Sequence, residues 1–162
     1  MSDAELFFRD DDNTAAVWRS VFIQIRHRHL TDAFLLAMRV PMRNLLRRHP
    51  QGIATLGVLE SSAMPVAEDV RQRQKEMFDQ VIGGRPVITA VVIEGDGVQA
   101  SLMRTVTRGV HAKMPGMKAR VGATVQEVGP WLVESMTHPQ LPSFTLAELQ
   151  DVVSALRKTA RQ

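Results

Sequence analysis

The run PVITAVVI, from Pro86 to Ile93, is apolar at nearly every position and rich in β-branched residues. A strand of this composition must be covered on both faces, as a central strand of a parallel sheet is. Residues 52 to 59, GIATLGVL, form a second short apolar run of the same kind. Apolar residues at helical spacing lie between the two runs, which indicates a strand–helix–strand unit. The pattern therefore predicts an α/β fold in which helices cover both faces of a largely parallel sheet.

The segment before these runs predicts an antiparallel addition to the sheet. Residues 15 to 26 are mostly β-branched, aromatic or otherwise apolar, which favours one long strand or a hairpin bent near Arg19 and Ser20. Thr31 is suited to cap the helix that follows. Pro41 lies inside this helix and removes a backbone donor, so we expect a kink or two shorter helices.

The segments on either side of the PVITAVVI run predict helices. Pro65 is expected to open one helix, and Gly83 and Gly84 are expected to end it. Residues 98 to 114 predict another helix, and residues 118 to 123 predict a last short strand. The side chains expected to face inward from the second of these helices are Leu102, Met103, Val106 and Val110.

The length of 162 residues suits one domain with one sizeable core. We expect residues 1–137 to form an α/β domain with a mixed, mostly parallel sheet of four to five strands. Residues 138–162 are expected to form a linker and an extra C-terminal amphipathic helix, which starts at a capping box of Thr145 and Glu148. Its apolar stripe would pack either on the domain or on a second subunit, in a two-fold homodimer.

The composition excludes several classes of protein. No apolar run approaches the roughly 20 residues needed to span a bilayer, and the acidic start MSDAELFFRDDD lacks a secretory pattern, so we expect a cytoplasmic protein without a membrane partner. The absence of cysteine excludes disulfides, thiolate zinc sites and a cysteine nucleophile. The net charge is only +3 and aromatic residues do not interleave the basic ones, so we expect no nucleic-acid partner.

Residues 95 to 100, GDGVQA, fit the pattern G-x-G-x-x-A after a strand and at the start of a helix. Backbone amides at a helix N-terminus could bind a phosphate there. However, Asp96 places a carboxylate where a diphosphate would lie, and no acidic residue follows about 20 positions on to bind a ribose. The alternative, which we favour, is a tight turn that needs glycine for its positive φ.

Other polar residues allow two kinds of site. His27 and His29 would share one face of a continuing strand with Asp32 just beyond, a set that could bind a divalent metal. The alternative is a solvent-facing strand end, and we assign no metal. Glu60 and Glu94 each follow a predicted parallel strand, at the edge where open α/β sheets bind ligands.

Two carboxylates at that edge could carry out acid–base chemistry, or they could cap the helices that follow. No serine lies in a G-x-S-x-G elbow. We therefore assign no catalytic residue and no cofactor, and we expect a protein without enzymatic activity.

Two predicted helices carry basic stripes, Arg39, Arg43 and Arg47 on one and Arg104, Arg108 and His111 on the other. Guanidinium groups at this spacing could bind carboxylates or phosphates bidentately. A charged stripe opposite an apolar stripe is also an ordinary property of amphipathic helices.

The order of segments carries a resemblance. VWRSVFIQIRHRHLT is followed by GIATLGVLESSAMP, by ITAVVIEGDGVQASLMRTVTRGV, and by a short strand and a helix ending in Trp131 and Leu132. Over about residues 14 to 133 the chain thus resembles the STAS family, the sulfate-transporter and anti-sigma-factor-antagonist domains. The resemblance implies a regulatory, protein-binding α/β domain. Antagonists of this family are phosphorylated on a serine in a D-S-x-G-type loop, and the nearest match here, ESSA at residues 60–63, has glutamate for aspartate and no glycine.

Together these observations lead us to expect a cytoplasmic regulatory or adaptor domain that binds another protein. The expected partner-binding residues are Arg39, Arg43 and Arg47. The alternative is a binding protein or enzyme for a nucleotide or another anionic small molecule at the strand-end loops. The expected ligand-binding residues are then Glu60, Ser61, Ser62, Glu94, Gly95 and Gly97.

Overall fold

The computed structural model describes residues 3–114 and 116–162. In this part of the chain one mixed sheet contains six strands, which lie side by side in the order of the sequence. The strands are β1 (Glu5–Arg9), β2 (Asn13–Trp18), β3 (Val21–Arg26), β4 (Ile53–Leu59), β5 (Val87–Ile93) and β6 (Lys118–Gly122). Strands β1 to β3 are antiparallel neighbours, and β3 to β6 run parallel. The predicted α/β class with a mostly parallel sheet is confirmed.

The prediction of four to five strands was wrong, because β1 forms an additional edge strand. Its apolar core is too short to identify a strand by composition. Turn chemistry instead pairs it with β2: the Asp10 carboxylate accepts hydrogen bonds from the backbone amides of Asp12 and Asn13, at 2.9 and 2.7 Å. An aspartate that bonds to the amides following it favours a tight reversal of the chain.

The helices are α1 (Asp32–Ala37), α2 (Arg39–Arg48), α3 (Glu68–Ile82), α4 (Val98–Ala112), α5 (Val125–Ser135) and α6 (Leu146–Ala160). The Thr31 side chain accepts a hydrogen bond from the Phe34 amide, so the predicted cap is confirmed. The region around Pro41 forms two helices, α1 and α2, with Pro41 in the first turn of α2. The hairpin bend at Arg19 and Ser20, between β2 and β3, is also confirmed.

The prediction that Pro65 opens a helix was wrong, since α3 begins at Glu68 after Ala67. The segment after β4 stays extended instead. The amide of Met64 donates to the carbonyl of Arg28 at 2.7 Å, which ties this segment to the chain beyond β3. Helical geometry becomes available only after that contact. The predicted end of the helix is right, because Gly83 is its left-handed cap.

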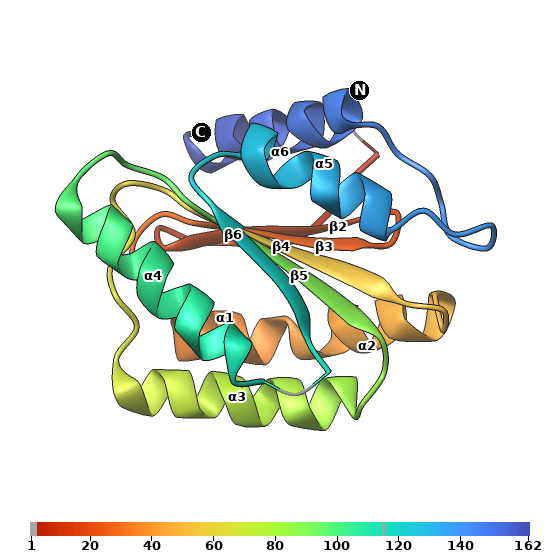
Figure 1. Cartoon of the computed structure of the whole chain (residues 1–162), viewed down its shortest axis with the longest axis horizontal. Helices are drawn as coiled ribbons and strands as arrows, with labels where there is room; N and C mark the ends of the chain where they lie inside the picture. Colours follow the sequence, from red (N-terminus) through yellow and green to blue (C-terminus); the bar gives the residue numbers. More distant parts are fainter. Residues whose placement is uncertain (1–2, 115) are drawn as a thin grey trace.

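Helices cover both faces of the sheet (Figure 1). The first three helices lie on one face, where Phe34, Met42 and Leu45 are buried with Phe22 and Ile53 of the sheet. Helices α5 and α6 lie on the other face, and α6 contacts β2 and β3. Among the described residues no helix is long and apolar enough to cross a membrane.

The apolar stripe of α6 is buried within its own domain. Leu149, Val152, Val153 and Leu156 belong to the core between this helix and the sheet. Helix α5 allows the close approach at Gly129, where an added Cβ would lie 2.3 Å from Cδ1 of Leu146. Of the two expected arrangements, the structure shows the packing of this helix on its own domain.

The orientation of α4 differs from the prediction at three of the four apolar positions. Leu102, Val106 and Val110 are exposed, whereas Met103 is partly buried as expected, and Arg104 and His111 are partly buried as well. The cause lies in the backbone groups of the neighbouring strands. Arg104 donates to the carbonyl of Ile93, the last residue of β5, and to the carbonyl of Gly95 in the loop that follows.

The ion pair between Arg19 and Glu148 joins the β2–β3 turn to the first turn of α6, with the closer oxygen at 3.0 Å. The hydrogen bond from Arg19, with one from the backbone of Thr145, lowers the pKa of Glu148 to about 2. A carboxyl with a lowered pKa stabilises the fold above its ordinary pKa near 4.5, and this contribution is lost as the pH falls through about 2.

Replacing Glu148 by Gln should therefore lower the free energy of unfolding, measured by urea denaturation, at neutral pH. The difference from the wild type should be constant above about pH 5 and should shrink as the pH falls from there toward about 2. Glu134→Gln changes an exposed carboxylate on α5 and serves as the control. A difference for Glu148→Gln that does not depend on pH would contradict this assignment.

Candidate functional site

The loops that follow β4 and β5 enclose a cavity of about 300 Å³. It lies at the carboxyl ends of parallel strands, where open α/β sheets bind ligands. Five of the six residues expected to bind a ligand line it: Glu60, Ser61, Glu94, Gly95 and Gly97. The sixth, Ser62, does not, because its hydroxyl donates to the carbonyl of His27 at 2.6 Å.

The N-terminal turn of α4 forms one wall of this cavity, with Gln99, Ala100 and Met103 lining it. Gly95 has a φ of +118°, as the tight-turn interpretation of GDGVQA requires. A Cβ at this position would also lie 3.2 Å from the Cβ of Ala100, so the loop can approach the helix only with glycine there.

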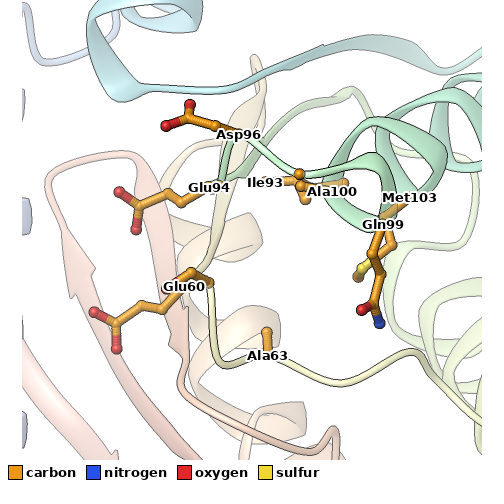
Figure 2. A pocket seen from close by; sticks show the side chains of 11 residues that line it. Glu60, Ala63, Ile93, Glu94, Asp96, Gln99, Ala100 and Met103 are labelled. Atoms are coloured by element: carbon orange, nitrogen blue, oxygen red, sulfur yellow. The ribbon is translucent and has the colours of Figure 1, made fainter.

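The carboxylates at this edge point away from the cavity wall formed by α4. Figure 2 shows the side chains of Glu60, Glu94 and Asp96 directed to one side, opposite to Ala100 and Met103. The interior of the cavity is therefore mainly backbone and apolar surface.

Glu60 and Glu94 share one cation from a distant part of the chain. Arg157, near the end of α6, donates to Glu94 at 2.6 Å and to Glu60 at 3.3 Å. All three side chains are partly buried. One guanidinium thus holds the two carboxylates together at the ends of β4 and β5.

His27 extends this cluster toward β2. Its Nδ1 is hydrogen-bonded to Glu60, and its Nε2 lies 3.1 Å from the hydroxyl of Thr14. Hydroxyl, imidazole and carboxylate follow one another here in the order used by nucleophilic enzymes. However, Thr14 is completely buried in β2, so no substrate can reach its hydroxyl. The arrangement fixes the orientation of the His27 ring and links three strand ends to α6.

The residues considered for a metal site are not brought together. Asp32 accepts two hydrogen bonds from Arg73, while His27 is engaged by Glu60. In residues 3–114 and 116–162 no group of three histidine, cysteine or carboxylate side chains could hold a metal ion.

The three arginines of the basic stripe on α2 differ in their exposure to solvent. Arg39 is partly buried and donates to Gln80 of α3 at 2.5 Å, so it joins two helices. Arg43 and Arg47 are exposed, and neither forms an ion pair with any residue that the structure describes. Arg47 and Arg48 also line an open hollow of about 390 Å³ together with Glu5 and Asn44.

The two arginines of the second basic stripe bind backbone carbonyls. Arg104 is bonded to two carbonyls near the end of β5, and Arg108 donates to the carbonyl of Val121 in β6 at 3.2 Å. His111 is partly buried, and desolvation lowers its pKa. Arg104 and Arg108 thus hold α4 on the sheet, whereas the buried Nδ1 of His111 has no hydrogen-bond partner among the described residues.

Arg26, at the end of β3, is a buried cation that the sequence analysis did not single out. Its Nε has no hydrogen-bond partner, no carboxylate of the described chain pairs with it, and burial lowers its pKa to about 10. It lines neither of the two hollows described above.

Comparison of the chain with protein-family models, with curated proteins and with solved structures finds no match. The resemblance to STAS domains therefore stays a prediction.

Sequence reasoning identified Glu60 and Glu94 but missed the groups that engage them. The pairing of the His27 ring with Glu60 joins the ends of neighbouring strands β3 and β4, and could be anticipated once their parallel order was known. Arg157 could not be found in this way, because 63 residues separate it from Glu94 and no local pattern relates them.

Removing the shared cation tests the importance of this cluster for the fold. Arg157→Gln leaves Glu60 and Glu94 close together without their guanidinium, so the free energy of unfolding should fall by about 1 to 3 kcal/mol. Arg161→Gln changes an exposed arginine on the turn after α6 and should have almost no effect. If the two variants are equally stable in chemical denaturation, the ion pairs of Arg157 contribute no net stability because solvent screens them.

Proposed function

We propose that the protein is a non-enzymatic regulatory or adaptor domain that acts by binding another protein, as the resemblance to STAS domains implies. The observation that carries the proposal is the surface of α1 and α2. Arg43 and Arg47 project from it without an acidic partner in the described chain, beside the exposed side chains of Leu36 and Val40.

These four residues share one face of the helical segment. The backbone of Met38, between the two helices, stays in the right-handed helical region with φ −78° and ψ −15°. Leu36, Val40, Arg43 and Arg47 therefore follow one another at the three- and four-residue spacing of a single helical face. We name this set the α1–α2 surface.

The chemistry of the α1–α2 surface suits an acidic partner with apolar side chains. Leu36 and Val40 are 70% and 62% exposed, which is unfavourable unless a partner covers them. Arg43 and Arg47 repel one another weakly at four-residue spacing, and carboxylates of a partner would relieve this repulsion. Arginine can pair bidentately with carboxylates and is enriched among the residues that dominate binding energy.

A phage-displayed peptide library tests this surface without knowledge of the natural partner. The wild type should enrich peptides that combine Asp or Glu with aliphatic residues. The double variant Arg43→Glu/Arg47→Glu should keep its stability within about 0.5 kcal/mol per site, because both side chains are exposed. Its affinity for the enriched peptides, measured by fluorescence anisotropy, should fall by at least about tenfold, or 1.4 kcal/mol.

The matched control is Lys158→Glu/Arg161→Glu, which changes the net charge equally at exposed positions near the end of α6. It should bind the peptides nearly as well as the wild type. Equal losses of peptide affinity in both double variants would show that only the net charge of the protein matters. Unchanged binding by a folded Arg43→Glu/Arg47→Glu protein would exclude the α1–α2 surface as the binding site.

A small-molecule binding protein is the second candidate, because the cavity at the ends of β4 and β5 brings five expected ligand residues together. A ligand that binds only the folded state raises the melting temperature. A thermal-shift screen with nucleotides and divalent metals separates the two candidates. The adaptor proposal expects no shift with any of them, and a shift of several degrees that is lost in Gly95→Val would favour the cavity.

A further inference from the structure

Helix α4 presents a continuous apolar stripe to solvent. Val98, Leu102, Val106 and Val110 are 87%, 60%, 46% and 39% exposed. They follow one another at four-residue intervals and therefore form one row along the helix. We name this row the α4 stripe. It spans most of the helix and, unlike the α1–α2 surface, it includes no charged side chain.

The orientation that exposes the α4 stripe is fixed by specific contacts. Arg104 donates to the Ile93 and Gly95 carbonyls at 2.7 and 3.1 Å, and Arg108 donates to the Val121 carbonyl at 3.2 Å. Turning the helix to bury the stripe would break these bonds and leave carbonyl groups near the sheet unpaired, which is costly. The stripe can therefore be covered only by something outside the described chain.

We propose that a second copy of this chain covers the α4 stripe, so that the protein forms a homodimer with two α4 helices packed against each other. The helix lies at the edge of the sheet beside β6, where it is free to meet another molecule (Figure 1). This inference uses a different surface from the proposed partner site and does not depend on it.

The charge pattern of the helix favours a second copy over other occupants. Helix α4 contains no acidic residue, and its two arginines are bonded to carbonyls on the sheet side. Two exposed charges flank the stripe, Asp96 before the start of the helix and Lys113 at its C-terminal cap. In an antiparallel pair, Lys113 of one copy lies at the level of Asp96 of the other, so a second copy offers a counter-charge to both, whereas an anionic lipid surface offers one only to Lys113. Two copies of the uncharged α4 stripe can pack against each other without electrostatic repulsion, because the contact buries no charged side chain.

The spacing of the α4 stripe also suits two-fold symmetry. In an antiparallel pair whose axis passes near Arg104, Val98 of one copy meets Val110 of the other, and Leu102 meets Val106. Ser101, Thr105 and Gly109 lie beside the stripe and are small, which allows the two helices to approach closely.

The area of contact indicates how strong the dimer is. A standard interface buries about 800 Å² on each partner, and one row of four aliphatic side chains supplies only part of this. We therefore expect a dimer that dissociates on dilution, with a dissociation constant of the order of micromolar.

Sedimentation velocity over a dilution series, from about 500 µM to about 1 µM, tests the proposal. The wild type should shift from dimer to monomer with dilution. Leu102→Glu and Val106→Glu should stay folded, because both side chains are exposed, and should be monomeric at every concentration. Leu36→Glu makes the same change at an exposed leucine of α1 and should dimerise like the wild type.

Single cysteines define the arrangement, since the natural chain has none. In the antiparallel pair Thr105 lies only about 3 Å along the axis from Thr105 of the other copy, so a short bifunctional maleimide should cross-link Thr105→Cys. Val98 lies about 18 Å along the axis from its counterpart, so Val98→Cys should not be cross-linked. Cross-linking of Val98→Cys in place of Thr105→Cys would overturn the antiparallel arrangement.

A wild type that is monomeric at about 500 µM would overturn the proposal, as would equal dimerisation of Leu102→Glu and the wild type. Neither result would affect the peptide-binding test of the α1–α2 surface, which is read out on other residues.

Discussion

Strands β2, β3 and β4 are buried along almost their whole length, and the need to exclude water from both of their faces determines where the helices lie. Helices α1 and α2 cover one face, and α6 returns from the end of the chain to cover the other over β2 and β3. Burying an aliphatic side chain stabilises a fold by about 1.5 to 3 kcal/mol. The buried residues of α6 together contribute an amount comparable with the whole stability of an ordinary domain. The same packing brings Arg157 to the strand ends, where it organises Glu60 and Glu94.

Features with a local signal could be predicted from the sequence. Strands β4 and β5 follow from apolar runs, although β5 lies next to the edge strand and is only partly buried. The cap at Thr31 follows from its hydroxyl, and the start of α6 from the capping box of Thr145 and Glu148. The meeting of Glu60 with Glu94 follows from the parallel order of β4 and β5. Features set by tertiary contacts could not be predicted. The start of α3 depends on a hydrogen bond between loops, and the partner of Glu94 comes from the far end of the chain.

Helix α4 shows why an amphipathic pattern does not by itself assign the buried face. Its apolar residues were expected to lie inward because burial of apolar surface usually dominates. Its neighbours β5 and β6, however, offer carbonyl groups at the strand ends and at the open edge of the sheet. Arg104 and Arg108 satisfy these groups, and the apolar residues are left on the outside. The molecule thus has two helical surfaces of different chemistry, a basic one on α1 and α2 and an uncharged one on α4. Such a difference suits two different partners, since the first needs carboxylates and the second needs apolar surface.

The orientation of α4 determines which helical surface is open to a partner, and cysteine labelling measures it directly. In separate variants of the cysteine-free chain, Leu102→Cys reports the outward face and Thr107→Cys reports the inward, partly buried face. A maleimide should react rapidly with Leu102→Cys in dilute solution and more slowly as the protein concentration rises, while Thr107→Cys should react slowly throughout. Slow labelling of Leu102→Cys and rapid labelling of Thr107→Cys in dilute solution would show that the apolar face lies inward, and would contradict an exposed α4 stripe.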